Sequence, residues 1–464
     1  AGTRVNSSGL VETVELLGSD VVINGDFTTD SDWTKGTGWS IANGKATSAG
    51  SNFGGQLKQT ILETNKIYLL TFDIVDYTSG VLSLESSYYG ETQLFSGIGS
   101  YTAYFNSSSQ TELRLYSQNF NGSIDNVSVK ESTKNNLARV DYDGTASSLL
   151  AEPQRTNVNT YSEDFGQSFY IKDSGVSVGT TNNVSPSGES NATKIDVTDN
   201  GRIYANVASD TYASSVFIKA GTFAYFKIGG VNIDLVAGTN ANGTIESLGS
   251  GWFRVGINYT GNRPFQIQAY PDGTYSSHTT TGDYYIWGSQ IEAGSYATSY
   301  IPTDGSTVTR VQDQYEKTGI SNLINSEEGV LFVEIASLSE SGNYRELGLS
   351  DGTTSNRVLI SYKSTDNVIR GSFQGSGGAN LEYTVTSSKD FHKIAVKWKV
   401  NDFALWVDGV EVGSDTSGSS FPADTLNSLA LDDGGGASKF FGKVKQLQVF
   451  KTALTDSELI ALTT

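Results

Sequence analysis

The sequence of 464 residues contains no cysteine, no methionine and only two histidines, His278 and His392. Without cysteine the chain forms no disulfide bond, and zinc sites built on cysteine or histidine are nearly excluded. A Ser-His-Asp triad has only these two histidines available. We expect a structural role for His392 and a solvated position for His278. Because even an initiating methionine is missing, we expect a processed chain or a segment of a longer protein.

Basic residues are also scarce, with 31 Lys and Arg against 50 Asp and Glu, which gives a formal net charge of −19. An acidic surface repels phosphate backbones, so the charge argues against nucleic-acid partners. No apolar run approaches 18 residues, so we expect no membrane insertion. Aromatic residues make up 11% of the chain, too many for a disordered protein. At roughly 150 residues per domain, the length predicts about three folded domains.

Short alternating runs of apolar and polar residues dominate the rest of the sequence. Clear examples are Ile67–Ile74, Ser215–Lys219, Ile394–Trp398 and Ala404–Val407. Alternation with period two, interrupted by Gly, Asn, Asp and Ser every 8–12 residues, is typical of β-sandwiches. The one clear helix candidate is Thr455–Leu462, where Thr455 and Glu458 have the spacing of a capping box. We therefore predict an all-β chain with very little helix.

Four stretches resemble phrases that recur in bacteriophage tail-fibre and head-fibre proteins. In that family a phrase like Thr3–Val14 is usually followed directly by one like Arg139–Gly144, and the longer stretches Ser148–Glu163 and Trp287–Asp313 are also similar to it. Here the first two phrases are separated by a whole block of the chain. We infer that this block is a module inserted into a fibre framework, with its own ends close together.

The inserted block itself resembles carbohydrate-binding modules of families 4 and 9, which are jelly rolls. The residues that carry the resemblance are Asn24–Phe27, Trp33, Lys66–Phe72 and Asp125–Val127. Near the C-terminus the chain resembles concanavalin-like and laminin-G-like sandwiches. That second resemblance depends on four stretches: Phe391–Trp398, Leu405–Val410, Phe441–Val449 and Ala453–Leu462.

Together these features predict three tandem β-sandwich or jelly-roll domains, the first of them inserted into an N-terminal framework. We expect a framework segment at residues 1–16, the inserted jelly roll at 17–131 and a connector at 132–147. A second, fibre-type jelly roll is expected at 148–313. The concanavalin/laminin-G-like sandwich is expected at 314–464.

Calcium is the one cofactor that the resemblances imply, in a structural role. Calcium prefers carboxylate and carbonyl oxygens, and the module family places it near positions equivalent to Asp26 and Asp125. Thr28 stands where that family commonly has Glu, and Asp26 and Asp125 could equally cap a turn and face solvent. The first two domains share a weak sequence plan, in which Glu163 and Glu292 of the second domain correspond to Asp26 and Asp125 of the first. In the third domain Asp432 and Asp433 form an acidic loop that could hold calcium or simply be solvated.

Tyrosines are the candidate glycan contacts, because sugar C–H faces stack on aromatic rings while sugar hydroxyls need polar partners. We predict that the exposed candidates are Tyr88, Tyr89, Tyr116, Tyr270 and Tyr275. In a strand, alternation would turn one ring of the Tyr88–Tyr89 pair outward. The six tryptophans are expected in the cores: Trp33, Trp39, Trp252, Trp287, Trp398 and Trp406.

No constellation of residues indicates catalysis. Glycoside hydrolysis needs two carboxylates across a cleft, and among 50 acidic residues no motif selects a pair. The sequence therefore predicts a non-enzymatic fibre or spike protein at the virion surface. It would attach to host surface glycans or polysaccharide, contact other virion proteins and, as the fibre resemblance implies, assemble as a homotrimer. Two alternatives remain: a purely structural decoration or fibre protein, and the non-catalytic binding region of a secreted polysaccharide-degrading enzyme.

Overall fold

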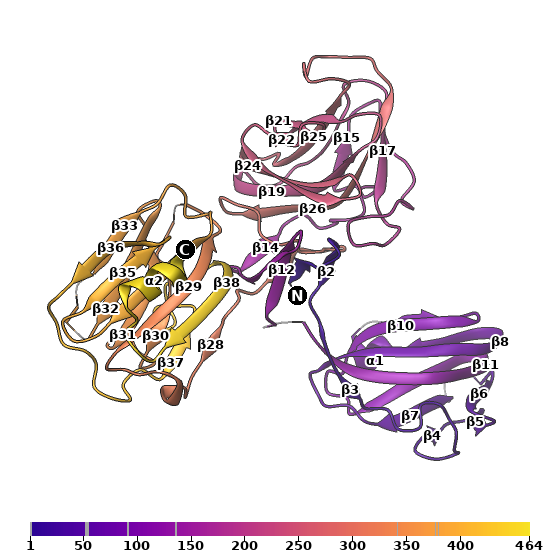
Figure 1. Ribbon diagram of the computed structural model, residues 1–464. Helices are drawn as coiled ribbons and strands as arrows, with labels where there is room; N and C mark the ends of the chain where they lie inside the picture. The colour runs from indigo at the N-terminus through magenta and orange to yellow at the C-terminus, as the bar shows by residue number, and fades with distance from the viewer. Residues whose placement is uncertain are drawn as a thin grey trace. The chain divides into compact units, whose positions relative to one another are not determined.

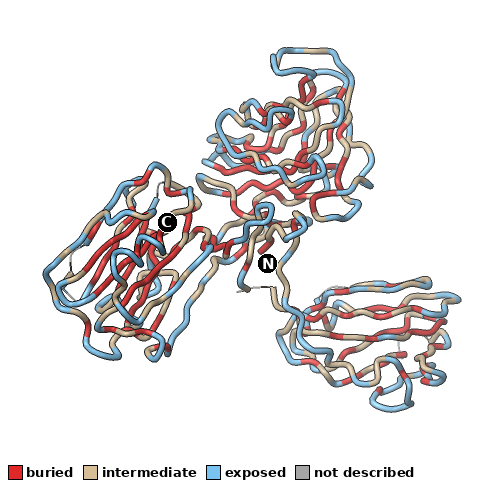
Figure 2. The backbone as a smooth tube through the Cα atoms, in the orientation of Figure 1, coloured by how far each residue is buried: buried red, intermediate tan, exposed pale blue. Residues whose placement is uncertain are grey.

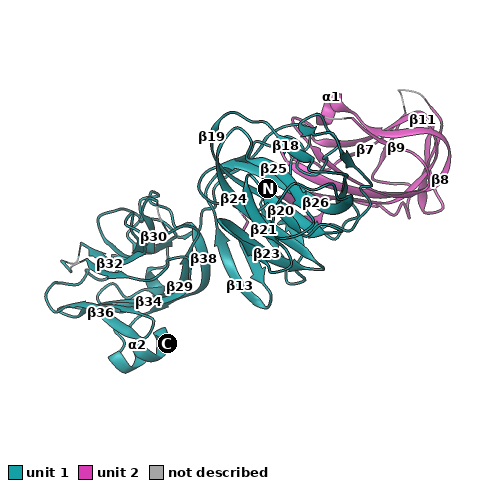
Figure 3. Ribbon diagram, turned by 90° about the horizontal axis from the view of Figure 1, so that it is seen from above, with its two compact units in different colours: residues 1–14, 138–464 teal, residues 15–137 magenta. Residues whose placement is uncertain are grey.

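The computed structural model describes residues 2–51, 55–90, 92–134, 137–340, 342–375, 377–378 and 380–464. They form two compact units, which Figure 3 distinguishes by colour: unit 1 comprises residues 1–14 and 138–464, and unit 2 comprises residues 15–137. All pairings between named strands are antiparallel, and among the described residues helix is confined to two α-helices and one 3-10 turn. The all-β prediction is confirmed. No described helix has the length and apolar character needed to cross a membrane.

Unit 2 is built around its two longest strands, β8 and β11, which pair along most of their length (Figure 1). The hydrogen-bonded order is β10-β8-β11-β6-β5, with β3 and β7 also on β11, β4 on β7 and β9 on β8. Inward side chains of these strands, including Trp33 and Trp39, form one apolar core. The elements are β3 (Leu16–Asp20), β4 (Thr34–Lys35), β5 (Trp39–Ala42), β6 (Lys45–Ala49), β7 (Gln56–Thr60), β8 (Ile67–Leu84), α1 (Ser86–Tyr89), β9 (Gln93–Phe95), β10 (Gly99–Asn106) and β11 (Glu112–Thr133).

The two ends of the inserted unit lie side by side, and so do the two segments of unit 1 that flank it. In unit 2, Leu16 of β3 pairs with Thr133 at the end of β11. In unit 1, the backbone N–H of Val5 donates to Asp141 Oδ1 at 2.9 Å, which holds the N-terminal segment beside the chain that resumes after residue 137. A module can be inserted at such a place without disturbing the host, because its two ends meet.

Unit 1 contains two sandwiches, of which the first has two six-stranded sheets. Their orders are β15-β18-β25-β20-β21-β22 and β16-β17-β26-β19-β24-β23, with an apolar core between them. The strands are β15 (Tyr170–Lys172), β16 (Val176–Val178), β17 (Thr193–Val197), β18 (Arg202–Ala205), β19 (Asp210–Ala220), β20 (Tyr225–Ile228), β21 (Val231–Asp234), β22 (Thr239–Asn240), β23 (Gly243–Gly249), β24 (Trp252–Gly261), β25 (Phe265–Tyr270) and β26 (Gly282–Ala293).

The C-terminal sandwich packs a seven-stranded sheet, β12-β13-β38-β29-β34-β35-β36, on a six-stranded sheet, β28-β37-β30-β31-β32-β33. Its elements are β28 (Glu316–Lys317), η1 (Ser321–Leu323), β29 (Gly329–Ser337), β30 (Arg345–Ser350), β31 (Arg357–Tyr362), β32 (Val368–Gln374), β33 (Leu381–Thr384), β34 (His392–Trp398), β35 (Phe403–Val407), β36 (Val410–Asp415), β37 (Ser428–Ala430), β38 (Gly442–Phe450) and α2 (Asp456–Thr463). Thr455 caps α2 with the expected capping box, so that prediction is confirmed.

Four short strands of unit 1 lie outside the sheets of the two sandwiches. They are β1 (Thr3–Val5), β2 (Val11–Thr13), β14 (Arg155–Asn157) and β27 (Val308–Arg310), which form the pairs β1-β2 and β14-β27. The hairpin of β12 (Arg139–Asp143) and β13 (Ala146–Ala151) extends a sheet of the C-terminal sandwich, with Leu149 opposite Val444. We expected a connector at 132–147 and a jelly roll from 148, whereas residue 148 falls inside β13. Asn135 and Asn136, within that expected connector, lie outside the described residues.

Buried residues follow the strands, while exposed residues concentrate in the turns (Figure 2). The six tryptophans are all buried, at most 7% exposed, which confirms their expected core positions. His392 is held by Asp408 at 2.6 Å and by the carbonyl of Ser387 at 3.0 Å, which fits its expected structural role. His278 differs from our expectation. Its Nε2 lies 2.9 Å from the carbonyl of Ala269 and its ring contacts Phe223, so it is packed rather than solvated.

Candidate functional site

The outer face of β18, β25 and β20 in the first sandwich of unit 1 gathers aromatic and polar side chains. Alternation along each strand sends Ile203, Ile267 and Phe226 into the core and their neighbours to the opposite face. We call that opposite set the tyrosine face; its members are Arg202, Tyr204, Tyr225, Lys227, Gln266, Gln268 and Tyr270. Register places Tyr225 beside Tyr270, and Gln268 between Arg202 and Lys227.

Tyr275, from the loop after β25, covers one end of the tyrosine face. Its ring lies 5.5 Å from that of Tyr270 and 6.2 Å from that of Tyr225, both edge-on. The Tyr275 hydroxyl donates to the carbonyl of Ile233 at 3.1 Å, and Lys227 donates to the Tyr275 carbonyl at 3.4 Å. Tyr275 has a backbone φ of 51°, a left-handed conformation that costs free energy in a tyrosine. The loop is thus held in one place over the strands.

Cations complete the face. Lys227 lies 5.3 Å from the centre of the Tyr270 ring, and Arg263 lies 4.5 Å from that of Tyr204. Arg202 is paired with Asp173 at 2.7 Å, which fixes its guanidinium beside the strands. Burial raises the pKa of Tyr270. Half-buried rings with neighbouring amide and cationic donors can stack on the apolar face of a sugar and bond its hydroxyls.

A smaller cluster of the same kind lies in unit 2, where α1 meets β11. The Tyr88 ring lies 5.8 Å from the Tyr116 ring, and the Arg114 guanidinium lies 4.3 Å from the centre of the Tyr88 ring. Arg114 is held in turn by Glu112 at 2.6 Å. Burial raises the pKa of Tyr116 to about 12, and its hydroxyl is buried with no hydrogen-bond partner among the described residues.

The structure therefore groups the five predicted tyrosines in two places, but three of them are not exposed. Tyr89 is 3% exposed, Tyr116 is 8% exposed and Tyr270 is 4% exposed. We were wrong to expect Tyr88 and Tyr89 in a strand, because they end the short helix α1, which turns Tyr89 inward. There the Tyr89 hydroxyl bonds the backbone of Glu112 and Arg114, each at 2.8 Å. Tyr88 and Tyr275 are the half-buried members of the predicted set.

The segments of Asp26 and Asp125 do come together. The N–H of Val127 donates to the carbonyl of Gly25 at 2.9 Å, and a Cβ on Gly25 would stand 2.0 Å from the Val127 carbonyl. Asp26 accepts from Thr28 and Asp125 from the N–H of Asn126. Two carboxylates and nearby backbone carbonyls fit calcium in kind. Among the described residues, however, no group of three or more Asp, Glu or His side chains converges as a metal site.

Glu163 and Glu292 are engaged separately. Glu163 accepts from Tyr300 at 2.9 Å and Asn191 at 3.0 Å. Glu292 is fully buried, and both of its oxygens accept from Thr298. Burial raises the pKa of both carboxyls. Thr298 already occupies both oxygens of Glu292.

Asp432 and Asp433 shape the loop before β38 and already face cations. Asp432 accepts from the N–H of Gly434 at 2.8 Å, and Asp433 accepts from those of Gly435 and Ala437 at 2.9 Å. Lys439 lies 3.8 Å from Asp432, and Arg357 lies 3.7 Å from Asp433. A calcium ion there would have to compete with two resident positive charges.

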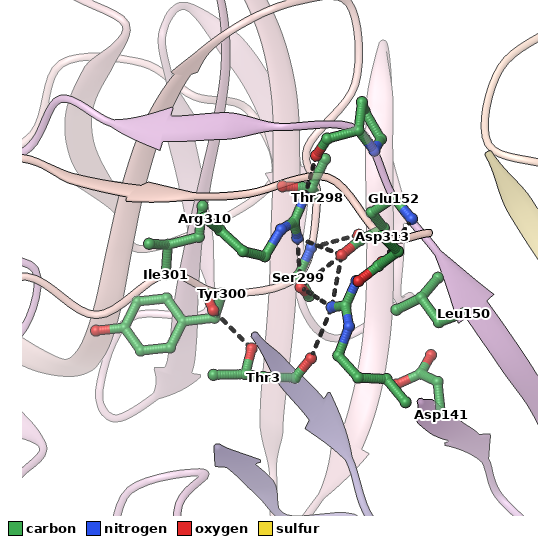
Figure 4. Close-up of polar contacts among 12 residues, drawn as sticks. Thr3, Asp141, Leu150, Glu152, Thr298, Ser299, Tyr300, Ile301, Arg310 and Asp313 are labelled. Atoms are coloured by element: carbon green, nitrogen blue, oxygen red, sulfur yellow. Dashed lines mark hydrogen bonds and ion pairs between the residues drawn. The ribbon is translucent and has the colours of Figure 1, made fainter. Parts of the chain in front are cut away.

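A buried polar network, which we did not anticipate from the sequence, occupies the centre of unit 1 (Figure 4). Arg139 Nη1 lies 2.7 Å from Glu152 Oε2, and Glu152 also accepts from Arg310. Asp313 accepts from Arg139 and from the backbone N–H of Glu152, the latter at 2.8 Å. Ser299 donates its hydroxyl to Glu152 at 2.6 Å. The carboxylates and the guanidinium Nη atoms pair with one another, while the buried Nε atoms of Arg139 and Arg310 have no partner among the described residues. The mutual pairing favours a structural role.

This network lies within the stretches that resemble fibre proteins. Arg139 lies in one of those phrases, Glu152 in another, and Ser299, Arg310 and Asp313 in the stretch that ends at residue 313. The carbonyl of Thr3, from the N-terminal phrase, accepts from Arg139 at 3.1 Å. These segments therefore form a junction that holds distant parts of the chain together.

Other functional candidates on the tyrosine face also escaped the sequence reasoning. Tyr204 and Tyr225 lie in short strands whose outward positions look like ordinary surface. The available signal was the alternation of large polar and aromatic residues in 202–205, 225–228 and 265–270. Only the strand register shows that these three segments place those residues on one surface.

Comparison with known proteins gives the class of fold. Residues 328–460 match the family model of the concanavalin A-like lectin/glucanases superfamily. No curated protein matches the chain. The chain is thus an all-β protein of jelly-roll and sandwich domains whose C-terminal sandwich is concanavalin A-like.

Solved structures with similar folds share little sequence with this chain. One is the Ruminococcus gnavus IT-sialidase CBM40 bound to α2,3-sialyllactose, with 17% sequence identity and a TM-score of 0.26. The match covers 32% of this chain and 98% of the CBM40 chain. Domains LG4-5 of the mouse laminin α1 chain are 13% identical, with coverage of 54% and 86% and a TM-score of 0.21. The CBM22-1-CBM22-2 tandem of Paenibacillus barcinonensis Xyn10C is 9% identical, with coverage of 61% and 100% and a TM-score of 0.24. Likeness at this level carries no functional argument.

Proposed function

We propose that this protein is a non-enzymatic glycan-binding protein that uses the tyrosine face as its principal contact surface. The observation that carries the proposal is the pair of Tyr225 and Tyr275 beside polar side chains on one sheet face. Arg202, Gln268 and Lys227 form the next row of that face, and Tyr204 lies beyond it. The C-terminal sandwich supports a carbohydrate ligand in general, because residues 328–460 match the concanavalin A-like lectin/glucanases superfamily. The Tyr88–Tyr116–Arg114 cluster of unit 2 is the second contact surface.

The ligand class is a host surface glycan or polysaccharide. An open sheet face offers few contacts per sugar, so each site binds weakly and several linked sites must supply the avidity. We propose that a homotrimeric fibre or spike at the virion surface presents these sites and contacts other virion proteins. The fibre-like phrases that meet at the Arg139–Glu152 network support this assignment.

A glycan array tests the binding proposal. The purified chain should bind a defined subset of glycans without releasing any product, and Tyr225→Ala together with Tyr275→Ala should lower the apparent affinity about tenfold. Tyr383→Ala is the matched control, since Tyr383 is 42% exposed but lies on β33 of the other sandwich. If the folded chain binds no glycan, or both sets of variants bind equally well, the proposal fails and a structural virion role is favoured.

The fibre proposal needs separate measurements. Analytical ultracentrifugation should give three times the mass of one chain, and an antibody to the chain should decorate intact particles. A monomer that is absent from particles contradicts the fibre role while leaving glycan binding to be judged on the array.

A further inference from the structure

Unit 1 contains a pocket of about 600 Å³ between its two sandwiches, away from the tyrosine face. Three cationic side chains line it: Arg155, Arg345 and Lys439. No Asp or Glu is among the described residues that line it. In a chain with a formal net charge of −19, a pocket whose described charged lining residues are all cationic is a candidate anion site.

The cations are held in place by their surroundings. Arg345 is 7% exposed and donates to the backbone carbonyls of Ser339 and Lys363. Its neighbour Glu346 forms a parallel bridge to Lys439, which brings the Lys439 segment alongside β30. Lys439 has Asp432 at 3.8 Å outside the pocket, and its side chain is 15% exposed. These side chains are pre-ordered, so binding an anion would cost little conformational entropy.

Arg155 is the cation most open to a ligand. It forms no ion pair with any described carboxylate, and its Nε is buried without a hydrogen-bond partner. Its Nη1 donates to the Gln154 carbonyl at 3.1 Å. The guanidinium lies 5.3 Å from the centre of the Tyr296 ring. An unpaired, partly desolvated guanidinium gains more than an exposed one from a bidentate anion.

Two tyrosines give the pocket an aromatic component. Tyr296 lies beside Arg155, and Tyr344 has the Arg370 guanidinium 4.8 Å from its ring centre. Burial raises the pKa of Tyr296; the charges of Arg155 and Arg345 lower it and those of Glu152 and Glu292 raise it. Asn343 and Gln312 add uncharged hydrogen-bonding groups. A simple inorganic anion would bind the cations but would not stack on the aromatic rings. A sugar with a carboxylate can bind the cations, stack on the rings and form hydrogen bonds with the amides.

We propose that this pocket binds a carboxylate-bearing saccharide. Arg155 and Lys439 hold the carboxylate, while Tyr296 and Tyr344 contact the sugar ring. The site is separate from the tyrosine face and does not depend on the function proposed for that face.

D-Glucuronate and D-glucose form a matched pair of probes, because they differ only in the carboxylate at C6. Titrations of the full chain by saturation-transfer NMR at low ionic strength should give at least tenfold tighter binding of glucuronate. Arg155→Gln should remove that preference, and so should Lys439→Gln, which guards against a folding defect in either variant. Added sodium chloride should weaken glucuronate binding and leave glucose unaffected.

Two controls separate this site from the others. Tyr383→Ala, outside both the pocket and the tyrosine face, should leave glucuronate binding unchanged. Inorganic phosphate should compete only weakly. Equal binding of glucuronate and glucose, an unchanged preference in both pocket variants, or phosphate binding as tight as glucuronate overturns the proposal.

Discussion

The guanidinium of Arg139 and the carboxylate of Glu152 lie 2.7 Å apart in unit 1, and neither side chain is more than 3% exposed. Arg139 begins β12, Glu152 follows β13, and Arg310 and Asp313 reach the same place from the far end of the first sandwich. Buried charges cost free energy unless they are paired and hydrogen bonded. The junction is therefore stable only as a complete set.

Removing the central carboxylate should expose this dependence. Glu152→Gln leaves two buried guanidinium groups without their main partner, so we expect the free energy of unfolding of unit 1 to fall by about 3–5 kcal/mol. Chemical denaturation followed by tryptophan fluorescence measures it. Glu12→Gln, which breaks the more exposed Arg4–Glu12 pair, should cost less than about 1 kcal/mol. Equal losses in the two variants would contradict the prediction.

The same carboxylate predicts a pH dependence. Burial raises the pKa of Glu152, but Arg310, Arg139 and Ser299 outweigh it and lower the pKa from 4.5 to about 2. Because the folded-state pKa lies below the unfolded one, this contribution is present above pH 4.5 and is lost as the pH falls toward 2. Burial raises the pKa of Asp313, whose contribution has the opposite sign. The stability difference between wild type and Glu152→Gln should therefore shrink from pH 5 to pH 2; a constant difference would refute it.

The capping box of α2 gives a prediction for the C-terminal sandwich. Glu458 N–H donates to Thr455 Oγ1 at 3.4 Å, and Thr455 N–H donates to Glu458 Oε2 at 2.8 Å. Thr455→Ala should lower the free energy of unfolding by about 1 kcal/mol, because an N–H of the first turn loses its acceptor. Thr455→Ser keeps the hydroxyl and should stay near wild type. Calorimetry checks both, and equal thermal midpoints for the two variants would argue against the cap.

Gly80 lies at a register shift in the pairing of β8 with β11. Its φ is +79°, and a Cβ there would stand 1.9 Å from the Asn119 carbonyl. Gly80→Ala should destabilise unit 2 by more than about 2 kcal/mol, from both strain and clash. Gly90 has a similar φ of +86° with nothing within 4 Å of a Cβ, so Gly90→Ala should cost only about 1 kcal/mol. If both variants unfold at the same denaturant concentration, the close approach is not what selects glycine at position 80.

The proposed structural calcium of unit 2 is tested by adding the metal. If Asp26, Asp125 and adjacent carbonyls hold calcium, millimolar calcium should raise the thermal midpoint of unit 2, since the ion binds only the folded state. EDTA should reverse the rise, and Asp26→Asn should abolish it. Magnesium, which demands stricter octahedral geometry, should have less effect. The absence of any shift in wild type would exclude calcium at this position.

The local sequence pattern was enough to predict the all-β class, the buried tryptophans and the helix cap. Period-two alternation was enough for the all-β class, because strands half-buried in a sandwich must alternate. The tryptophans were predictable core residues because large aromatic surfaces are costly to leave in water. The cap at Thr455 was predictable because it depends only on residues three apart in sequence.

Only the tertiary structure decided which residues form a surface together. Tyr204, Tyr225 and Tyr275 are spread over more than 70 residues, and strand pairing together with the loop after β25 brings them to one face. Register likewise buries Tyr116 and Tyr270, which look like exposed tyrosines in sequence. The Arg139–Glu152 junction and the cationic pocket unite side chains from distant segments. Long-range pairing sets such contacts, and no local periodicity records which distant residue completes a charge pair.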